Sequence, residues 1–335
     1  MSSSDETTQV DAPDVTVAIP TYNSGATVAD TMRSVFAQTG CTFEIVVADD
    51  GSADNSIHVV KQTADGDPRV RIVEVGPSKP GPSTARNTAM KLARGRYIAT
   101  ADADDLMTPD RLATLVAYGD ETGADVVADN ILRRFIDEDP VREVVLFEPE
   151  ALRARPKISL LALVDPNMKD HYGAPVGYLK PLIRTDSWRR LGVRYDENVS
   201  VADDHYFLAE LLARGADIRV TDHVGYIYMT HSGSHSYRIT PEKFINGLDA
   251  EDRFMARHAG EFDAETLAAC RRRRDWLLRM GRLENIVYAL KARKPIEALS
   301  HGLGAPAAWP YLATRFSAIG ANKLRAAYSR AARAI

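Results

Sequence analysis

Short apolar runs alternate with amphipathic segments through the first 130 residues of the chain. The runs are rich in β-branched residues and end at polar or turn-forming residues, which is typical of buried strands. The segments between them carry apolar residues three or four positions apart, as on one face of a helix. The pattern predicts strands at 15–19, 43–48, 70–75, 97–100 and 124–128, with helices at 28–36, 53–64, 84–93 and 109–121.

Strands that alternate with helices of this length favour an α/β fold, Rossmann-like, with a mainly parallel sheet flanked by helices. The pattern changes near residue 131. Charged and apolar residues alternate through 133–147, which indicates a hairpin at a sheet edge, and 165–178 has the Pro, Gly and His content of a long loop. After residue 240 the spacing predicts a helical C-terminal extension, for example over 277–290.

Composition narrows the class of protein. The 335 residues, 45% of them hydrophobic, are enough for two units or for one large domain with an appendage. A net charge of -4 and a pI near 6.1 argue against a nucleic-acid partner. Cys41 and Cys270 form neither a metal motif nor a disulfide framework, which favours a reducing, cytoplasmic setting.

The chain shows no apolar segment of the kind that targets or anchors a protein. Residues 1–12 are polar and predict a flexible tail, because they lack the apolar stretch of a signal peptide. No run of 18 or more apolar residues occurs, so no transmembrane helix is expected.

Polar clusters follow three of the predicted strands. Because the carboxyl ends of parallel strands meet at one edge of a sheet, these clusters should converge there, where such folds bind ligands. The clusters are Pro20-Thr21-Tyr22-Asn23, Asp49-Asp50-Gly51-Ser52 and Asp102-Ala103-Asp104-Asp105. So many carboxylates around one crevice predict a divalent cation, Mn²⁺ or Mg²⁺, bound together with phosphate oxygens. Each cluster alone also fits turn or helix-capping chemistry; their combination favours a site.

Taken together, these motifs resemble the inverting family 2 glycosyltransferases of the GT-A fold, of the bacterial exopolysaccharide and cell-surface glycan type. The segments that carry the resemblance are 15–23, 44–52, 85–87, 95–98, 102–105 and 109–111. The resemblance covers 13–236 and implies a glycosyltransferase domain there. It divides this domain into a nucleotide-sugar half at 13–130 and an acceptor half at 131–236, and it leaves a helical, basic region at 237–335.

The resemblance also implies roles for single residues. Tyr22 would lie near the base, Asp50 would accept the uracil N–H, and Asp102 would contact the ribose. Arg86 would lie near the base or the phosphates. Metal binding would fall to Asp104 and to His231, although a histidine of a surface loop is an equal interpretation of His231. The implied nucleotide-binding set is Pro20, Thr21, Tyr22, Asn23, Asp50, Arg86, Asp102 and Ala103.

The family's catalytic base is the second residue of a Glu-Asp pair that opens a helix, and Asp203-Asp204 matches this position with Asp in place of Glu. A hydroxyl that attacks the anomeric carbon needs a base to take its proton. An adjacent carboxylate raises the pKa of such a group, which suits this task. We assign the base to Asp204 and keep Asp203 as the alternative. Negative charge that merely stabilises a helix N-terminus is the other interpretation of the pair.

The donor implied by the resemblance is a nucleotide-sugar, with a UDP-sugar first, and the acceptor is a glycan or a lipid-linked glycan. Residues 173–184 match the acceptor region. Arg271 to Arg274 and the run 314–335, with five basic and no acidic residues, suggest peripheral contact with the inner face of the plasma membrane. A solvated helical face or a subunit contact in an oligomer is the alternative.

Two other functions fit parts of the pattern. A sugar-phosphate nucleotidyltransferase has a similar sheet, but the glycine-rich, arginine-containing loop expected after its first strand is replaced here by Pro20 to Asn23. A non-catalytic nucleotide-sugar-binding protein would keep Asp104 and lose the base, whereas Asp203-Asp204 is present. Both are therefore less favoured than glycosyl transfer.

Overall fold

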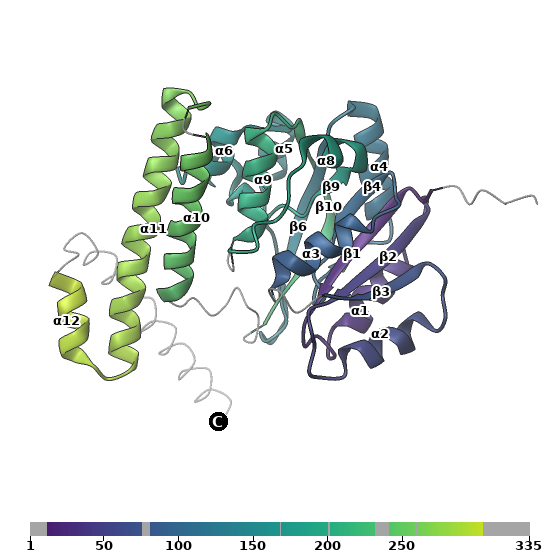
Figure 1. Ribbon diagram of the computed structural model, residues 1–335, viewed down its shortest axis with the longest axis horizontal. Helices are drawn as coiled ribbons and strands as arrows, with labels where there is room; N and C mark the ends of the chain where they lie inside the picture. The colour runs from purple at the N-terminus through teal and green to yellow at the C-terminus, as the bar shows by residue number, and fades with distance from the viewer. Residues whose placement is uncertain are drawn as a thin grey trace, which may run out of the picture.

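The computed structural model describes residues 12–75, 81–167, 169–199, 202–231, 241–258 and 260–303. A ten-stranded sheet with helices on both faces forms the larger part of the molecule, and three further helices lie to one side of it (Figure 1). Most of the predicted tail and the basic run 314–335 lie outside the described residues.

Residues 13–130, the predicted nucleotide-sugar half, contain a parallel sheet in the order β3-β2-β1-β4. All residues of β1, β2 and β4 are buried, because α3 packs on one face while α1, α2 and α4 pack on the other. Each strand and helix predicted in this half is present. The strands are β1 (Val15–Thr21), β2 (Phe43–Asp49), β3 (Val70–Glu74) and β4 (Tyr97–Thr100), and the helices are α1 (Val28–Phe36), α2 (Ser56–Ala64), α3 (Pro82–Lys91) and α4 (Arg111–Thr122).

Beyond β4 the sheet is mixed rather than parallel. A three-residue strand, β9, inserts antiparallel between β4 and β6, and β6 then pairs in parallel with β10. The predicted hairpin is the antiparallel pair β6–β7, and two further short strands, β5 and β8, pair antiparallel with β10. The strands are β5 (Leu106–Met107), β6 (Val126–Phe135), β7 (Arg142–Val145), β8 (Lys157–Ile158), β9 (Leu182–Arg184) and β10 (Ile218–Thr230).

Short helices cover this second half. The segment predicted as a long loop, 165–178, contains one turn of helix, α7, and one 3₁₀ turn, η1. Helix α9 is the one that begins at the acidic pair predicted to be catalytic. The helices are α5 (Pro149–Ala154), α6 (Leu160–Val164), α7 (Lys169–Tyr172), η1 (Val176–Tyr178), α8 (Thr185–Leu191) and α9 (Asp203–Ala213).

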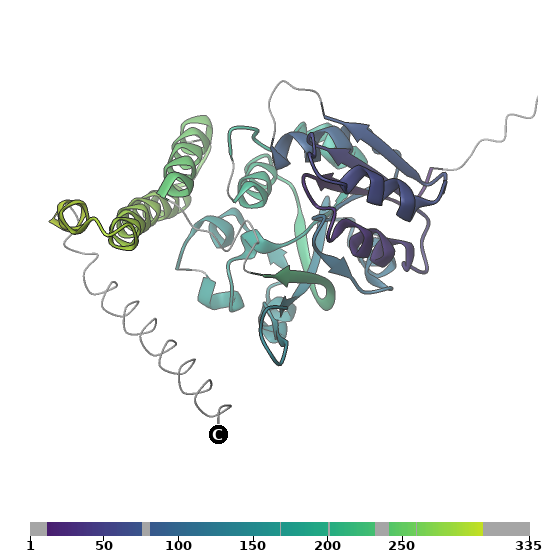
Figure 2. The same cartoon turned by 90° about the horizontal axis from the view of Figure 1, so that it is seen from below.

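The C-terminal extension is helical, as predicted, with α10 (Pro241–His258), α11 (Ala264–Lys291) and α12 (Pro295–Leu303). α10 and α11 pack side by side against the sheet domain, and Phe254 and Cys270 belong to its main core. The end of α11 and α12 form a separate small core and stand away from the sheet (Figure 2). None of the described helices is long and apolar enough to cross a membrane.

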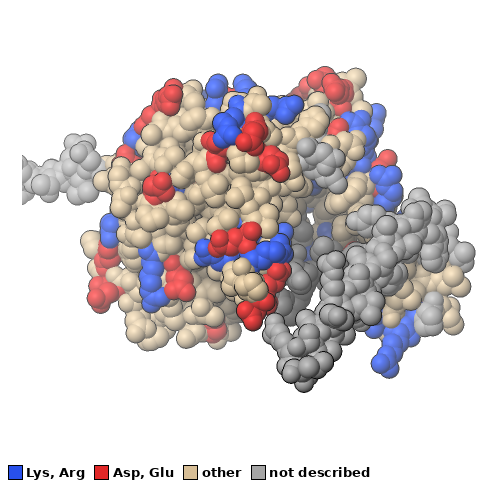
Figure 3. Space-filling model, turned by 180° about the vertical axis from the view of Figure 1, so that it is seen from behind, with Lys and Arg blue, Asp and Glu red and all other residues tan. Residues whose placement is uncertain are grey.

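The molecular surface has intermixed charges. On the face opposite to that of Figure 1, the described Lys and Arg side chains lie beside Asp and Glu side chains (Figure 3). Arg142–Glu138 and Arg33–Asp30 are examples of ion pairs between exposed side chains.

Candidate active site at the carboxyl edge of the sheet

The loops that follow β1 and β2 are tied together at the carboxyl edge of the parallel strands. The Asn23 backbone N–H donates to Ser52 Oγ at 2.9 Å, and the Ala53 N–H donates to Asn23 Oδ1 at 2.8 Å. Asn23 adopts φ 48°, a left-handed conformation that asparagine tolerates better than most residues. The two predicted polar clusters are therefore adjacent.

Asp102 follows β4 at the same edge and lies between two cations. Its Oδ1 accepts from Arg86 Nη2 and its Oδ2 accepts from Lys180 Nζ, each at 2.6 Å. Both cationic side chains are 6% exposed. Burial alone would raise the pKa of Asp102, but Lys180 and Arg86 outweigh it and hold the pKa well below its usual value.

The same two cations reach the acidic pair at the start of α9. Arg86 Nη1 bonds to Asp203 Oδ2, and Lys180 Nζ lies 2.6 Å from Asp204 Oδ2. Three carboxylates and two cations thus form one network that joins α3, the β4 loop, the segment before β9 and α9. Burial opposes charge on Arg86 and Lys180, yet the surrounding carboxylates raise the pKa of both groups. Burial raises the pKa of Asp203.

Tyr195 completes the surroundings of Asp204. Its hydroxyl donates to Asp204 Oδ1 at 3.1 Å, so both oxygens of this carboxylate have partners. The Tyr195 ring stacks on Phe207, with 4.1 Å between ring centroids, and the Arg86 guanidinium lies 5.3 Å from the centroid of the Tyr195 ring. These contacts fix the direction in which the Asp204 carboxylate points.

Asp105, which the sequence left without a role, anchors the β4 loop to β10. It is buried, accepts from the Tyr226 hydroxyl at 2.7 Å and accepts from the Met229 N–H at 2.8 Å. The Tyr226 hydroxyl in turn accepts from the Asp102 N–H at 3.2 Å. Burial, together with Asp102 and Asp104, raises the pKa of Asp105 well above its usual value.

The residues expected to hold a metal ion lie near each other. Burial and the neighbouring Asp102 raise the pKa of Asp104, whereas His231, just after β10, lowers it through its charge. Asp104 makes no ion pair with the residues that the structure describes. No group of three His, Cys, Asp or Glu side chains that would hold a metal alone occurs in that part of the chain. This donor set fits a cation that takes its remaining ligands from phosphate and water.

The predicted nucleotide-binding residues differ in accessibility. Tyr22 is 59% exposed at the edge, while Thr21, Pro20 and Ala103 are buried, so any contact of these three with a donor must come mainly through the backbone. Burial raises the pKa of Asp50, and a hydrogen bond from the Gly81 backbone opposes this.

The contacts of Arg86 lie within the charged network. Its side chain is buried between Asp102 and Asp203, and its guanidinium lies over the Tyr195 ring. A place near the base or the phosphates stays a prediction.

Three residues with structural importance at the site were not predicted from the sequence as charge partners. Lys180 was included only in the acceptor segment, and Tyr195 was not singled out. Arg111 forms a fully buried ion pair with Asp129 and donates to the Lys180 carbonyl at 2.8 Å. The sequence signal that could have identified Lys180 is its position as a single charged residue within the run Gly177-Tyr-Leu-Lys-Pro-Leu-Ile183.

Comparison with known proteins agrees with this geometry. Residues 16–184 match the profile of Glycosyl transferase family 2. The chain is similar to the succinoglycan biosynthesis protein ExoO of Rhizobium meliloti, with 32% identity over 311 residues, 91% of this chain and 86% of ExoO. It is also similar to the UDP-Glc:alpha-D-GlcNAc-diphosphoundecaprenol beta-1,3-glucosyltransferase WfaP of Escherichia coli, with 27% identity over 66% of this chain and 79% of WfaP.

Solved structures share the fold. S. aureus TarS 1-349 in complex with UDP-GlcNAc superimposes with a TM-score of 0.57, at 18% identity over 87% of this chain and 92% of that one. The mannosyltransferase PcManGT of Pyrobaculum calidifontis, in complex with GDP-Man and Mn²⁺, has a TM-score of 0.55 at 19% identity, over 91% of this chain and 83% of that one. At such identities the likeness concerns the fold alone.

The α/β sheet carries a cluster of charged side chains at its carboxyl edge, and half of the chain matches the family profile. Together with the shared fold, this defines a glycosyltransferase of the GT-A type. The chain belongs to glycosyl transferase family 2. The resemblance, the fold class and the enzyme class expected from the sequence are thereby confirmed.

Proposed function

We propose that this enzyme transfers a sugar, with inversion, from a nucleoside diphosphate sugar to a hydroxyl of a glycan or lipid-linked glycan during assembly of a bacterial surface polysaccharide. The observation that carries the proposal is the network in which Asp102 and the Asp203-Asp204 pair share two buried cations at the carboxyl edge. The names of ExoO and WfaP support the polysaccharide setting.

The donor would lie across the loops that follow β1, β2 and β4. Tyr22, which is exposed, would offer an aromatic face to the base, Asp50 would accept from a base N–H, and Asp102 would contact the ribose. Uridine is the first candidate base, which the UDP complexes of structural neighbours support.

A divalent cation, Mn²⁺ or Mg²⁺, would be held by Asp104, with His231 as a further ligand and the donor's phosphates as the rest. When bound, it neutralises charge that develops on the departing diphosphate. The protein's own contribution is to hold the half-buried Asp104 carboxylate in the loop that follows β4.

The chemical step follows from the acidic pair. The acceptor oxygen forms a bond to the anomeric carbon while the bond from this carbon to the diphosphate oxygen breaks, and the hydroxyl proton passes to Asp204. We propose a supporting role for Asp203, because the resemblance places the base at the second residue of the pair; the Asp203 carboxylate binds Arg86 and accepts from the N–H of Asp204. Tyr178, 44% exposed, lies in the predicted acceptor segment and would contact a sugar ring.

A donor screen tests the reaction class. The enzyme is incubated with UDP-, GDP- and TDP-sugars and Mn²⁺, and released nucleoside diphosphate is measured; we expect release from a UDP-sugar. Asp104→Asn should remove the Mn²⁺-dependent part of UDP binding in calorimetry, whereas the exposed control Asp186→Asn should not. Metal-dependent binding that persists in Asp104→Asn would contradict the metal assignment.

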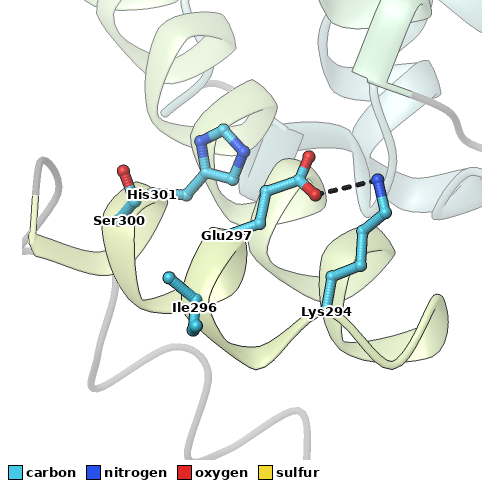
Figure 4. A pocket seen from close by; sticks show the side chains of 5 residues that line it. All are labelled: Lys294, Ile296, Glu297, Ser300 and His301. Carbon is cyan, nitrogen blue, oxygen red and sulfur yellow. Dashed lines mark ion pairs between the residues drawn. The ribbon is translucent and has the colours of Figure 1, made fainter.

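We further propose that the α11–α12 region contacts an anionic membrane surface near a lipid-linked acceptor. Ile296 is 85% exposed and Leu299 53% exposed, and Lys291 and Arg293 lie just before them. A hollow beside α12 is lined by Lys294, Ile296, Glu297, Ser300 and His301 (Figure 4). Lys294 and Glu297 form an ion pair there. Exposed apolar side chains next to basic residues are typical of interfacial helices.

Flotation with anionic liposomes at low salt tests this proposal. The wild type should rise with the liposomes, and the double variant Ile296→Asp/Leu299→Asp should stay at the bottom. A wild type that stays at the bottom contradicts the proposal.

A further inference from the structure

We infer that Lys180 is a positioning residue of the transfer reaction, which holds the carboxylate of Asp204 in place beside the proposed donor contact Asp102. This inference rests on the proposed role of Asp204 as the base. It adds a residue whose side chain the sequence motifs did not single out.

The contacts of Lys180 join the two halves of the site. Its ammonium lies 2.6 Å from Asp102 Oδ2 in the β4 loop and 2.6 Å from Asp204 Oδ2 at the start of α9. Arg86 makes the parallel connection from Asp102 to Asp203. Each member of the acidic pair therefore has its own cation, and the cation of the candidate base is the lysine.

The fold fixes the position of Lys180 from behind. Its carbonyl accepts from Arg111 Nη2 at 2.8 Å, and Arg111 is held by Asp129 in an ion pair with no exposed surface. Strand β9 begins two residues later, at Leu182, and its pairing with β4 fixes the following backbone. Since the backbone is held, the reach of the ammonium toward Asp204 is set by the protein itself and needs no bound donor.

The charges around Asp204 explain what the lysine contributes. Asp203 lies on the same helix, Arg86 comes from α3, Asp102 from the β4 loop and Tyr195 from the segment before α9. Without Lys180, three carboxylates would share one cation. Asp204 Oδ2 would lose its partner, and the carboxylate would be free to turn away from the attacking hydroxyl. A base that is out of place cannot take the acceptor's proton, so transfer should slow while donor contacts remain.

The test is Lys180→Met in the full-length enzyme, assayed with the sugar donor found by the screen above. We expect kcat for transfer to fall about 100-fold, as for loss of a general base, with donor KM changed less than about threefold. The matched control is Lys157→Met, which removes a lysine that is 65% exposed and paired with Asp217, and which should leave both quantities unchanged.

Restoring the charge separates a positioning role from general damage. Lys180→Cys in a Cys41→Ser background, alkylated with 2-bromoethylamine, rebuilds an ammonium of nearly the same length, and kcat should recover at least tenfold. The treated Cys41→Ser protein, which keeps Cys270, is the control for alkylation elsewhere in the chain. Should the methionine variant fail to fold, as judged by UDP binding in calorimetry, Lys180→Gln replaces it in the same assay.

Two outcomes would overturn the inference alone. Lys180→Met with wild-type kcat, alongside an inactive Asp204→Asn, would show that the base works without this lysine. A rise in donor KM with unchanged kcat would make Lys180 a donor contact instead. Wild-type transfer by Asp204→Asn would overturn the base assignment itself, and this inference with it.

Discussion

Asp102 shows how single residues at this site depend on one another. Its two oxygens bind two different cations, and each cation continues to one residue of the acidic pair at the start of α9. Breaking a buried pair by removing one partner leaves an uncompensated charge, which costs far more than losing an exposed pair. We therefore expect that removal of any one member will destabilise the folded site.

Arg86→Met should lower the free energy of unfolding by about 3 kcal/mol or more, because Asp102 and Asp203 would lose their shared partner in a buried setting. Urea denaturation followed by circular dichroism measures this. Arg33→Met removes an exposed pair with Asp30 and should cost less than about 1 kcal/mol. Equal effects of the two substitutions would show that the network is not a stabilising unit.

His205, next to the acidic pair on α9, should make stability depend on pH. Burial lowers the pKa of His205 well below its usual value, so the unfolded chain binds this proton more readily than the folded protein does. Stability is then fully present above about pH 6.5 and falls by up to about 1.4 kcal/mol per pH unit below it. Unfolding midpoints between pH 5 and 7 should show this slope in the wild type and in the exposed control His58→Gln. An unchanged slope in His205→Gln would assign the dependence to other groups.

At the scale of elements, the first half of the fold was predictable and the second half less so. Strands β1 to β4 are buried on both faces, so their sequences are continuous apolar runs that stand out from the amphipathic helices between them. The short strand β9 and the turns α7 and η1 are too brief to show a period, and their structure depends on tertiary contacts. The sheet was therefore expected to be more parallel than it is.

The sequence predicts one part of the candidate site, the three loops at the sheet edge, but not the contact between Lys180 and Asp204. Convergence of the loops after β1, β2 and β4 follows from parallel topology, which placed Asn23, Asp50 and Asp102 at one edge. The partnership of Lys180 with Asp204 does not follow from topology. It depends on the position of β9 and on the buried Arg111, neither of which has a local sequence signature.

The two hydrophobic clusters of the C-terminal helices should respond separately to substitution. Phe254→Ala opens the main core and should cost about 3 to 5 kcal/mol, with faster amide hydrogen exchange extending into α9. Ile286→Ala lies in the small cluster shared with α12, and faster exchange should be confined to the end of α11 and to α12. Hydrogen exchange with mass spectrometry distinguishes the two. Exchange that spreads from Ile286→Ala into α9 would show one cooperative unit instead.

For the whole molecule, the C-terminal extension supports the helix that carries the acidic pair. The Tyr206 hydroxyl of α9 donates to the Gly247 carbonyl of α10 at 2.9 Å, and Glu210 of α9 accepts from Arg257 and contacts His258 at 2.9 Å. Together with the packing of Phe254, these contacts join the far side of α9 to α10. The extension thus takes part in positioning the active site, whatever surface α12 contacts.

The most direct test of the central claim is sugar transfer by Asp204→Asn, measured together with UDP binding and with Asp203→Asn as the matched variant. We expect Asp204→Asn to bind UDP and metal within about threefold of the wild type and to lose transfer by a factor of about 100 or more, since the acceptor proton would have no base. Asp203→Asn should lose stability and retain measurable transfer. Transfer at the wild-type rate by Asp204→Asn would contradict the proposed mechanism.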